Sequence, residues 1–124
     1  MPAPYPDPQS FTNNKSIQAA TVANGATKSA SIPVYGMDVV GIYVPASLAA
    51  GVTSMTFEVS DDGSTFVQAR NPDNTAITHT LNTTAGYQKL SSVMDLAGAN
   101  FIKLVVNSAP SVDAAFKVAL KGLK

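Results

Sequence analysis

The chain has 124 residues, eight basic residues that balance eight acidic ones, and no cysteine. Without thiols it cannot form a disulfide framework, a thiolate metal site or a cysteine nucleophile. A neutral chain also lacks the overall field that draws proteins to nucleic acid or anionic lipid, so we expect neither as a partner. No signal peptide and no membrane-spanning run is visible, which predicts a soluble protein made in a cytoplasm.

The first segment of the chain, residues 1–14, is rich in proline, which occupies every second position from Pro2 to Pro8. Proline fixes φ and removes an N–H donor, so we expect an extended N-terminal arm. One interpretation is a disordered tail. The other is an arm that lies on a neighbouring subunit. The expected contact residues of such an arm are Pro4, Tyr5, Pro6 and Phe11.

Short alternating runs follow the arm and predict strands. The most apolar run, 38–44, is stopped by Pro45 and should be central in its sheet. Pro33 denies the run 29–35 a donor, which places that run at an edge or a bend. The other predicted strands are 15–22, 76–81, 84–90, 101–106 and 114–121, together with the two runs that flank residues 60–64.

No segment keeps a helical period over its length, and 45–51 and 91–98 are expected to form loops or single helical turns. Roughly eight short strands separated by Gly, Pro and Asn turns predict an all-β fold. We expect an antiparallel β-sandwich of the jelly-roll kind, in one domain that covers residues 15–124.

The acidic stretch Ser60-Asp61-Asp62-Gly63-Ser64 has two interpretations. Its oxygens could bind calcium, but calcium takes about six to eight oxygen ligands, and the spaced ligands of an EF-hand loop are missing. Asp and Gly are also the residues that a short hairpin loop requires. We therefore expect the Asp61-Asp62-Gly63 turn to reverse the chain, and we expect no metal or cofactor.

Other candidate residues carry no catalytic pattern, so we expect no enzyme. His79, the single histidine, shares a strand side with Ile77 and Leu81 and should be half-buried and structural, because a general base also needs a nucleophile and an orienting acid. Glu58 lies mid-strand and should be solvated or paired across strands. The remaining candidate carboxylates are Asp38 and Asp95. The basic residues Lys117, Lys121 and Lys124 should form a solvated strand face or contact an acidic patch on a partner.

Two stretches resemble small virion proteins of tailed bacteriophages. The first, YGMDVVGIYVPA at 35–46, is an apolar strand followed by a Pro-Ala loop. The second, FEVSDDGSTF at 57–66, is a strand that enters a Ser-Asp-Asp-Gly turn, and apolar strands at 101–106 and 114–121 follow. The Asp-Asp-Gly turn by itself also occurs in discoidin-like carbohydrate-binding sandwiches, so only the combination is informative.

This resemblance implies a head decoration protein, also called a capsid cement protein. Such proteins are small β-sandwiches, often trimeric, that bind the major capsid protein on the virion surface and stabilise the lattice. We therefore expect a structural protein that clamps neighbouring capsomers by multivalent contacts and forms a homo-oligomer, with a trimer favoured. The alternatives are a tail, neck or head-fibre subunit, or a carbohydrate- or receptor-binding module. The binding module would use the loops 45–51, 61–64 and 71–75.

Overall fold

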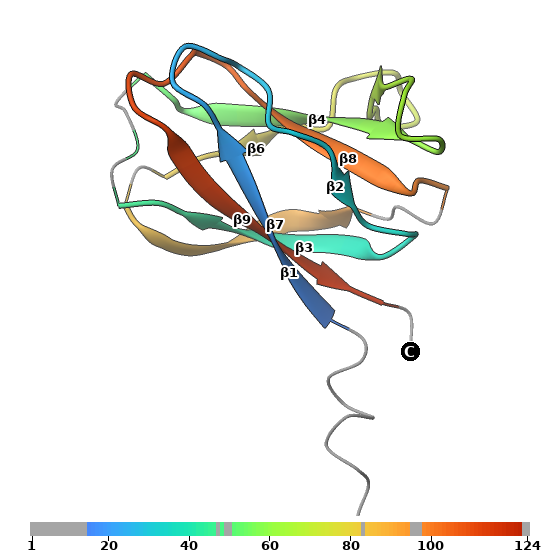
Figure 1. The fold of residues 1–124 in the computed structure, drawn as a ribbon. Helices are drawn as coiled ribbons and strands as arrows, with labels where there is room; N and C mark the ends of the chain where they lie inside the picture. Colours follow the sequence, from blue (N-terminus) through green and yellow to red (C-terminus); the bar gives the residue numbers. More distant parts are fainter. Residues whose placement is uncertain (1–14, 47, 49–50, 83, 95–97, 123–124) are drawn as a thin grey trace, which may run out of the picture.

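The computed structural model describes residues 15–46, 48, 51–82, 84–94 and 98–122. These residues form two antiparallel sheets that face each other as a sandwich, and no helix occurs among them (Figure 1). It follows that no helix in these ranges could span a membrane. The predicted all-β fold is confirmed. The nine strands are β1 (Lys15–Val22), β2 (Ile32–Pro33), β3 (Asp38–Val44), β4 (Ser54–Ser60), β5 (Val67–Gln68), β6 (His79–Thr80), β7 (Gly86–Met94), β8 (Phe101–Val106) and β9 (Ala114–Lys121).

The strand order is that of a jelly roll. One sheet has the order β1-β9-β3-β7, and the other has the order β2-β8-β4-β5 with β6 also paired to β4. The strand position beside β4 is thus divided between β5 and β6, which are two residues long each. As predicted, β3 is internal in its sheet, and β2, which contains Pro33, lies at an edge.

The core fills the space between the two inner sheet faces. Residues of β9 alternate between core and solvent, so that Phe116 is buried while Lys117 and Lys121 are exposed. This is the period of two that the sequence predicted. Phe57 on β4 belongs to the same buried cluster as Phe116 on β9, and both rings are among the largest fully buried side chains.

The end of β7 corrects one prediction. Residues 91–94 continue the strand, where we expected a loop or a helical turn. The pairing of β7 with β3 shifts register between Val39 and Gly41, because Val39 lies opposite Met94 whereas Gly41 lies opposite Lys89. Such a bulge breaks the period of two by which a strand is recognised, so the sequence pattern does not predict this part of β7.

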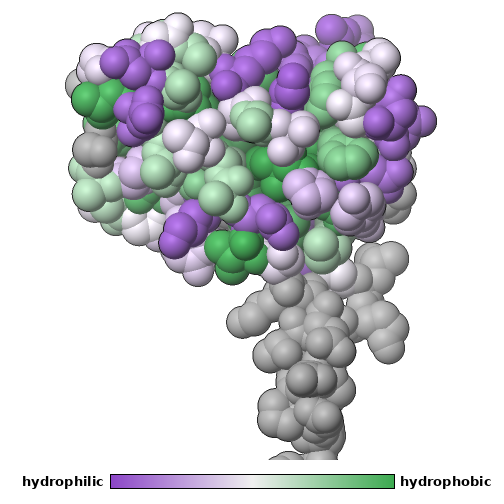
Figure 2. All heavy atoms as spheres, in the orientation of Figure 1, coloured by the Kyte–Doolittle hydropathy of each residue, from purple (hydrophilic) through white to green (hydrophobic). Residues whose placement is uncertain are grey.

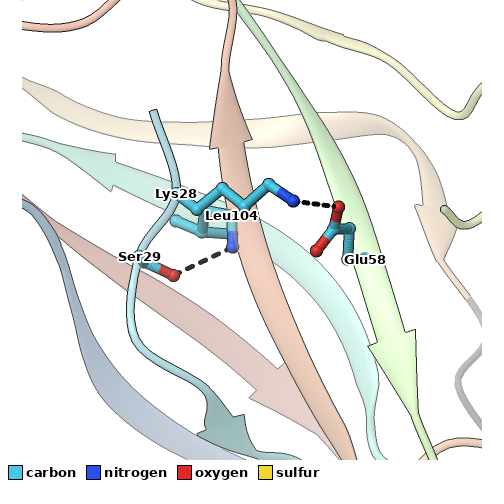
Figure 3. Close-up of polar contacts among 4 residues, drawn as sticks. All are labelled: Lys28, Ser29, Glu58 and Leu104. Atoms are coloured by element: carbon cyan, nitrogen blue, oxygen red, sulfur yellow. Dashed lines mark hydrogen bonds and ion pairs between the residues drawn. The ribbon is translucent and has the colours of Figure 1, made fainter. Parts of the chain in front are cut away.

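The segment 27–33 follows the edge of β8 without forming a continuous strand. The Ser29 N–H donates to the Leu104 carbonyl at 2.9 Å, and the Leu104 N–H donates to the Ser29 hydroxyl at 2.9 Å (Figure 3). The serine side chain thus takes the place of a backbone acceptor. This substitution explains why only the two residues of β2 form a strand within the predicted run 29–35.

Candidate functional site

The acidic turn after β4 is organised by the side chain of Asp62. Its Oδ1 accepts hydrogen bonds from the N–H groups of Ser64 at 2.8 Å and Thr65 at 3.0 Å, and from the Ser60 hydroxyl at 2.9 Å. The bonds from Thr65, Ser64 and Ser60, in that order, hold the pKa of Asp62 below its ordinary value. Gly63 has a φ of 79°, the left-handed conformation that favours glycine.

This geometry confirms that residues 60–64 reverse the chain. The carboxylate of Asp62 is already used by the backbone of its own turn, as in the Asx turns of short hairpin loops. Among the residues that the structure describes, no group of three or more His, Asp or Glu side chains is placed to hold a metal ion.

A hollow of about 270 Å³ lies beside this turn. It opens between the end of β4, the edge strand β5 and residues 98–99. Its lining is apolar apart from a few polar groups at the turn. The lining residues are Val59, Ser60, Asp61, Thr65, Val67, Gly98 and Ala99. The hollow is an open surface depression, and its polar lining residues include Asp61 and Thr65.

The three loops that we assigned to a carbohydrate site do not come together. The loop 45–51, of which 47, 49 and 50 lie outside the described residues, precedes β4, and the turn 61–64 follows it. A seven-residue strand spans about 20 Å, so these two loops lie at opposite ends of the sandwich (Figure 1). The hairpin 71–75 projects from the sheet edge between β5 and β6. A site built from all three is therefore wrong.

His79 is structural, as predicted, and it links the two sheets. Its side chain is buried, with 8% exposed, and its Nε2 lies 3.2 Å from Oε1 of Gln88. Oε1 of Gln88 also accepts from the N–H of Asn82, and the Gln88 amide N–H donates to the Asn82 carbonyl. His79 must therefore donate from Nε2. Burial lowers the pKa of His79, and the hydrogen bond to Gln88 offsets part of that effect.

Glu58 pairs across strands, as expected. Its carboxylate lies 2.8 Å from Nζ of Lys28 (Figure 3). The same outer face of the five-stranded sheet carries Lys103, which lies opposite Glu58 on β8 with its Nζ 4.5 Å from the ring centre of Phe66. Among the described residues this face therefore carries one ion pair, between Lys28 and Glu58, and one cation–π contact, between Lys103 and Phe66.

The outer face of the four-stranded sheet is different, because aromatic and small residues gather on it. Tyr43 and Tyr87 lie opposite each other on β3 and β7, with ring centres 5.0 Å apart. Tyr87 extends over Gly41, where any Cβ atom would overlap its ring. We call this surface the tyrosine face. It consists of Ile17, Ala19, Gly41, Tyr43, Tyr87, Lys89, Ala115, Lys117, Ala119 and Lys121.

The tyrosine face exposes apolar surface and carries positive charge. Ile17, Tyr43 and Tyr87 are 48%, 39% and 49% exposed. Of the side chains that the structure describes, the exposed lysines Lys89, Lys117 and Lys121 lie among them, and Asp38 lies opposite Lys121. The predicted basic strip of the last strand is thus part of a larger surface, although Lys124 lies outside the described residues.

Sequence reasoning identified both Tyr43 and Tyr87 as strand residues but did not bring them together. Their contact depends on the register between β3 and β7, which are far apart in the chain. The expected arm contacts Pro4, Tyr5, Pro6 and Phe11 lie outside the described residues, as does Asp95.

Comparisons with known proteins add a likeness of fold. No protein-family model matches the chain, and no curated protein matches it. Among solved structures, the SPBc2 prophage-derived protein YomS is similar, with a TM-score of 0.48 and 15% identity over 86% of this chain and 93% of that one. A CBM32 module from a family 31 glycoside hydrolase of Clostridium perfringens has a TM-score of 0.45 and 11% identity over 84% of this chain and 75% of that one. At these values neither match indicates what this chain binds.

Proposed function

We propose that this chain is a phage virion structural protein that decorates the outer surface of a capsid and stabilises the head by binding neighbouring capsomers. The observation that carries the proposal is the tyrosine face, on which the Tyr43–Tyr87 pair and Ile17 are exposed among small residues. Tyrosine is enriched where proteins meet, and exposed apolar patches mark interaction sites. The resemblance of residues 30–122 to phage decoration proteins supports the same role.

The charge of the tyrosine face favours an acidic partner surface. Lys89, Lys117 and Lys121 would meet acidic residues of the major capsid protein, which directs the encounter more than it strengthens the final contact. Each single contact can be weak in this arrangement. A homo-oligomer, for which we favour a trimer, would bind several capsomers at once and gain from effective concentration. The arm, with Pro4, Tyr5, Pro6 and Phe11, would supply contacts beyond the sandwich.

The proposal is tested with purified protein and expanded capsids that lack it. We expect the protein to bind the capsids and to raise the temperature at which they are disrupted, because it adds contacts between capsomers. The double variant Tyr43→Ser, Tyr87→Ser should bind at least about tenfold more weakly, as expected when a central aromatic anchor is lost. The matched control Val67→Ser, Val112→Ser removes two side chains that are 60% and 47% exposed elsewhere, and it should bind normally.

Two results would contradict this role. One is a protein that binds no capsid in any maturation state. The other is immunogold label on the tail or neck of intact particles, which would favour a tail, neck or head-fibre subunit instead.

A second candidate function, carbohydrate or receptor binding, is favoured by the hollow beside the acidic turn. A glycan array should then give reproducible hits that Asp61→Asn abolishes. Asp61 is the suitable position because the Asp62 carboxylate organises the turn, and its loss would disturb the fold. Ser64→Ala is the control, since the Ser64 hydroxyl makes no hydrogen bond among the described residues.

A further inference from the structure

The outer edge of β1 is long and unprotected. β1 pairs with β9 on one side, and among the described residues no backbone group of 15–22 makes a hydrogen bond on the other. Natural edge strands are usually blunted by proline, by a bulge, by inner charges or by shortness. The sequence of β1, KSIQAATV, has no proline, carries its one charge at Lys15, and keeps an unbroken register with β9 over eight residues.

The N-terminal arm has the backbone chemistry of a strand that can pair along one side only. In an extended chain, successive N–H groups point to opposite edges of the strand. Proline at 2, 4, 6 and 8 removes the donors of one edge over residues 2–8, and Ser10 is the next residue on that edge that keeps its N–H. The odd-numbered residues keep both donor and acceptor on the other edge. They are Ala3, Tyr5, Asp7, Gln9 and Phe11.

The same alternation sorts the side chains of the arm. Side chains two residues apart lie on the same face of a strand, so Tyr5 and Phe11 share one face while the four prolines occupy the other. A strand with donors on a single edge can complete an open sheet without exposing a new edge for further pairing. Proline at every second position therefore fits a strand that pairs along one edge better than it fits a disordered tail.

We propose that the arm of one copy of this chain adds as a one-sided strand to the open edge of β1 in a neighbouring copy. The lengths agree, because residues 3–11 extended span about 30 Å and the eight residues of β1 about 26 Å. A fold-back of the arm onto its own β1 would need a tight turn at 12–14. Asn13 and Asn14 lie at that position and no glycine does, because the first glycine of the chain is Gly25, so amide exchange is needed to separate a fold-back from a contact between copies.

This contact joins an arm to an edge, two different surfaces, and it is therefore heterologous. Repeated around an axis, such contacts close into rings, including trimers. The inference deepens the oligomeric part of the proposed function. It is tested without capsids, so that its failure and the failure of capsid binding can be told apart.

The test uses the full chain in sedimentation velocity and NMR amide exchange. Ala3→Pro with Asp7→Pro removes two donors from the pairing edge and leaves Tyr5 and Phe11 in place. We expect association to weaken by about tenfold or more for the pair, as when backbone hydrogen bonds are lost and their acceptors left unpaired. The matched control, Pro4→Ala with Pro8→Ala, changes two prolines on the opposite edge and should associate as the parent does.

Amide exchange then locates the contact. We expect the β1 amides that point away from β9 to be protected in the parent at high concentration and to lose protection on dilution or in the donor-removed variant. Three results would overturn the proposal: a parent that stays monomeric at all concentrations, equal effects of the two variant pairs, or protection of the outward-facing β1 amides that does not depend on concentration, which would mean that the arm pairs with its own chain. If the donor-removed variant still binds capsids, the proposed decoration role holds independently of the contact between arm and β1.

Discussion

The two sheets of the sandwich end in opposite ways at their edges. The five-stranded sheet is bounded by β2, β5 and β6, each two residues long, and β2 contains Pro33. The four-stranded sheet is bounded by β1 and β7, of eight and nine residues. Short, proline-bearing edges resist pairing with another chain, whereas a long edge with unbroken register, as β1 has, invites it. The four-stranded sheet is therefore the one suited to joining a partner.

The outer faces differ in the same sense. On the five-stranded sheet, Lys28 pairs with Glu58 and Lys103 lies over Phe66. On the four-stranded sheet, the tyrosine face exposes aromatic and aliphatic groups. The face turned to the viewer in Figure 2 mixes hydrophilic and hydrophobic residues in small groups, with hydrophilic ones gathered toward the loops at the top and right. Exposed large apolar side chains are not confined to this face, because Tyr35 is 68% and Val67 is 60% exposed elsewhere, but Ile17, Tyr43 and Tyr87 share one surface.

The largest expected effect is on the free energy of unfolding, from substitutions in the core that the two sheets share. Phe57→Ala in the five-stranded sheet and Phe116→Ala in the four-stranded sheet should each lower the free energy of unfolding by about 3–5 kcal/mol, because each empties a fully buried ring site. Denaturant titration followed by circular dichroism measures both. Phe66→Ala, a partly exposed ring, is the control and should cost less. Two separate unfolding transitions would contradict a common core.

A smaller loss is expected where the five-stranded sheet relies on a side chain. Ser29→Ala removes the acceptor of the buried Leu104 N–H and should lower the free energy of unfolding by about 1–3 kcal/mol. The control Ser64→Ala should leave it nearly unchanged. An unchanged stability for Ser29→Ala would show that β8 does not depend on this contact.

The link between the sheets should respond to pH. The pKa of His79 is lowered in the folded protein from 6.5, so the unfolded chain binds a proton more readily. The contribution of neutral His79 to the free energy of unfolding is therefore fully present above about pH 6.5. It is lost as the pH falls below this value and through the folded pKa. His79→Gln should remove this slope from a series of denaturant titrations. As the only histidine is at 79, a slope that survives the substitution would assign it to another group.

The smallest effect is expected at the surface pair of the five-stranded sheet. Lys28→Ala should cost less than about 1 kcal/mol, because the lysine side chain is 52% exposed and its attraction to Glu58 is screened by water. High salt should reduce the difference further. A loss as large as that of Ser29→Ala would mean that this face is held by charge more than we infer.

The sequence predicted the parts of the fold that depend on local alternation. Phe116, Val118 and Leu120 face the core as expected, and β3 is central because its run is apolar throughout. It missed the end of β7, where a bulge breaks the alternation, and it missed the tyrosine face. That face forms only when β3 and β7 pair in one register. The sequence of one strand does not determine its register with a strand far along the chain.

The central claim is that this chain covers a capsid surface. Its most direct test is the number of copies per purified particle, measured by quantitative mass spectrometry against the major capsid protein. A decoration protein should be present in the hundreds, in a fixed ratio to the capsid subunit. A handful of copies per particle would place the chain at the tail or neck and contradict the account.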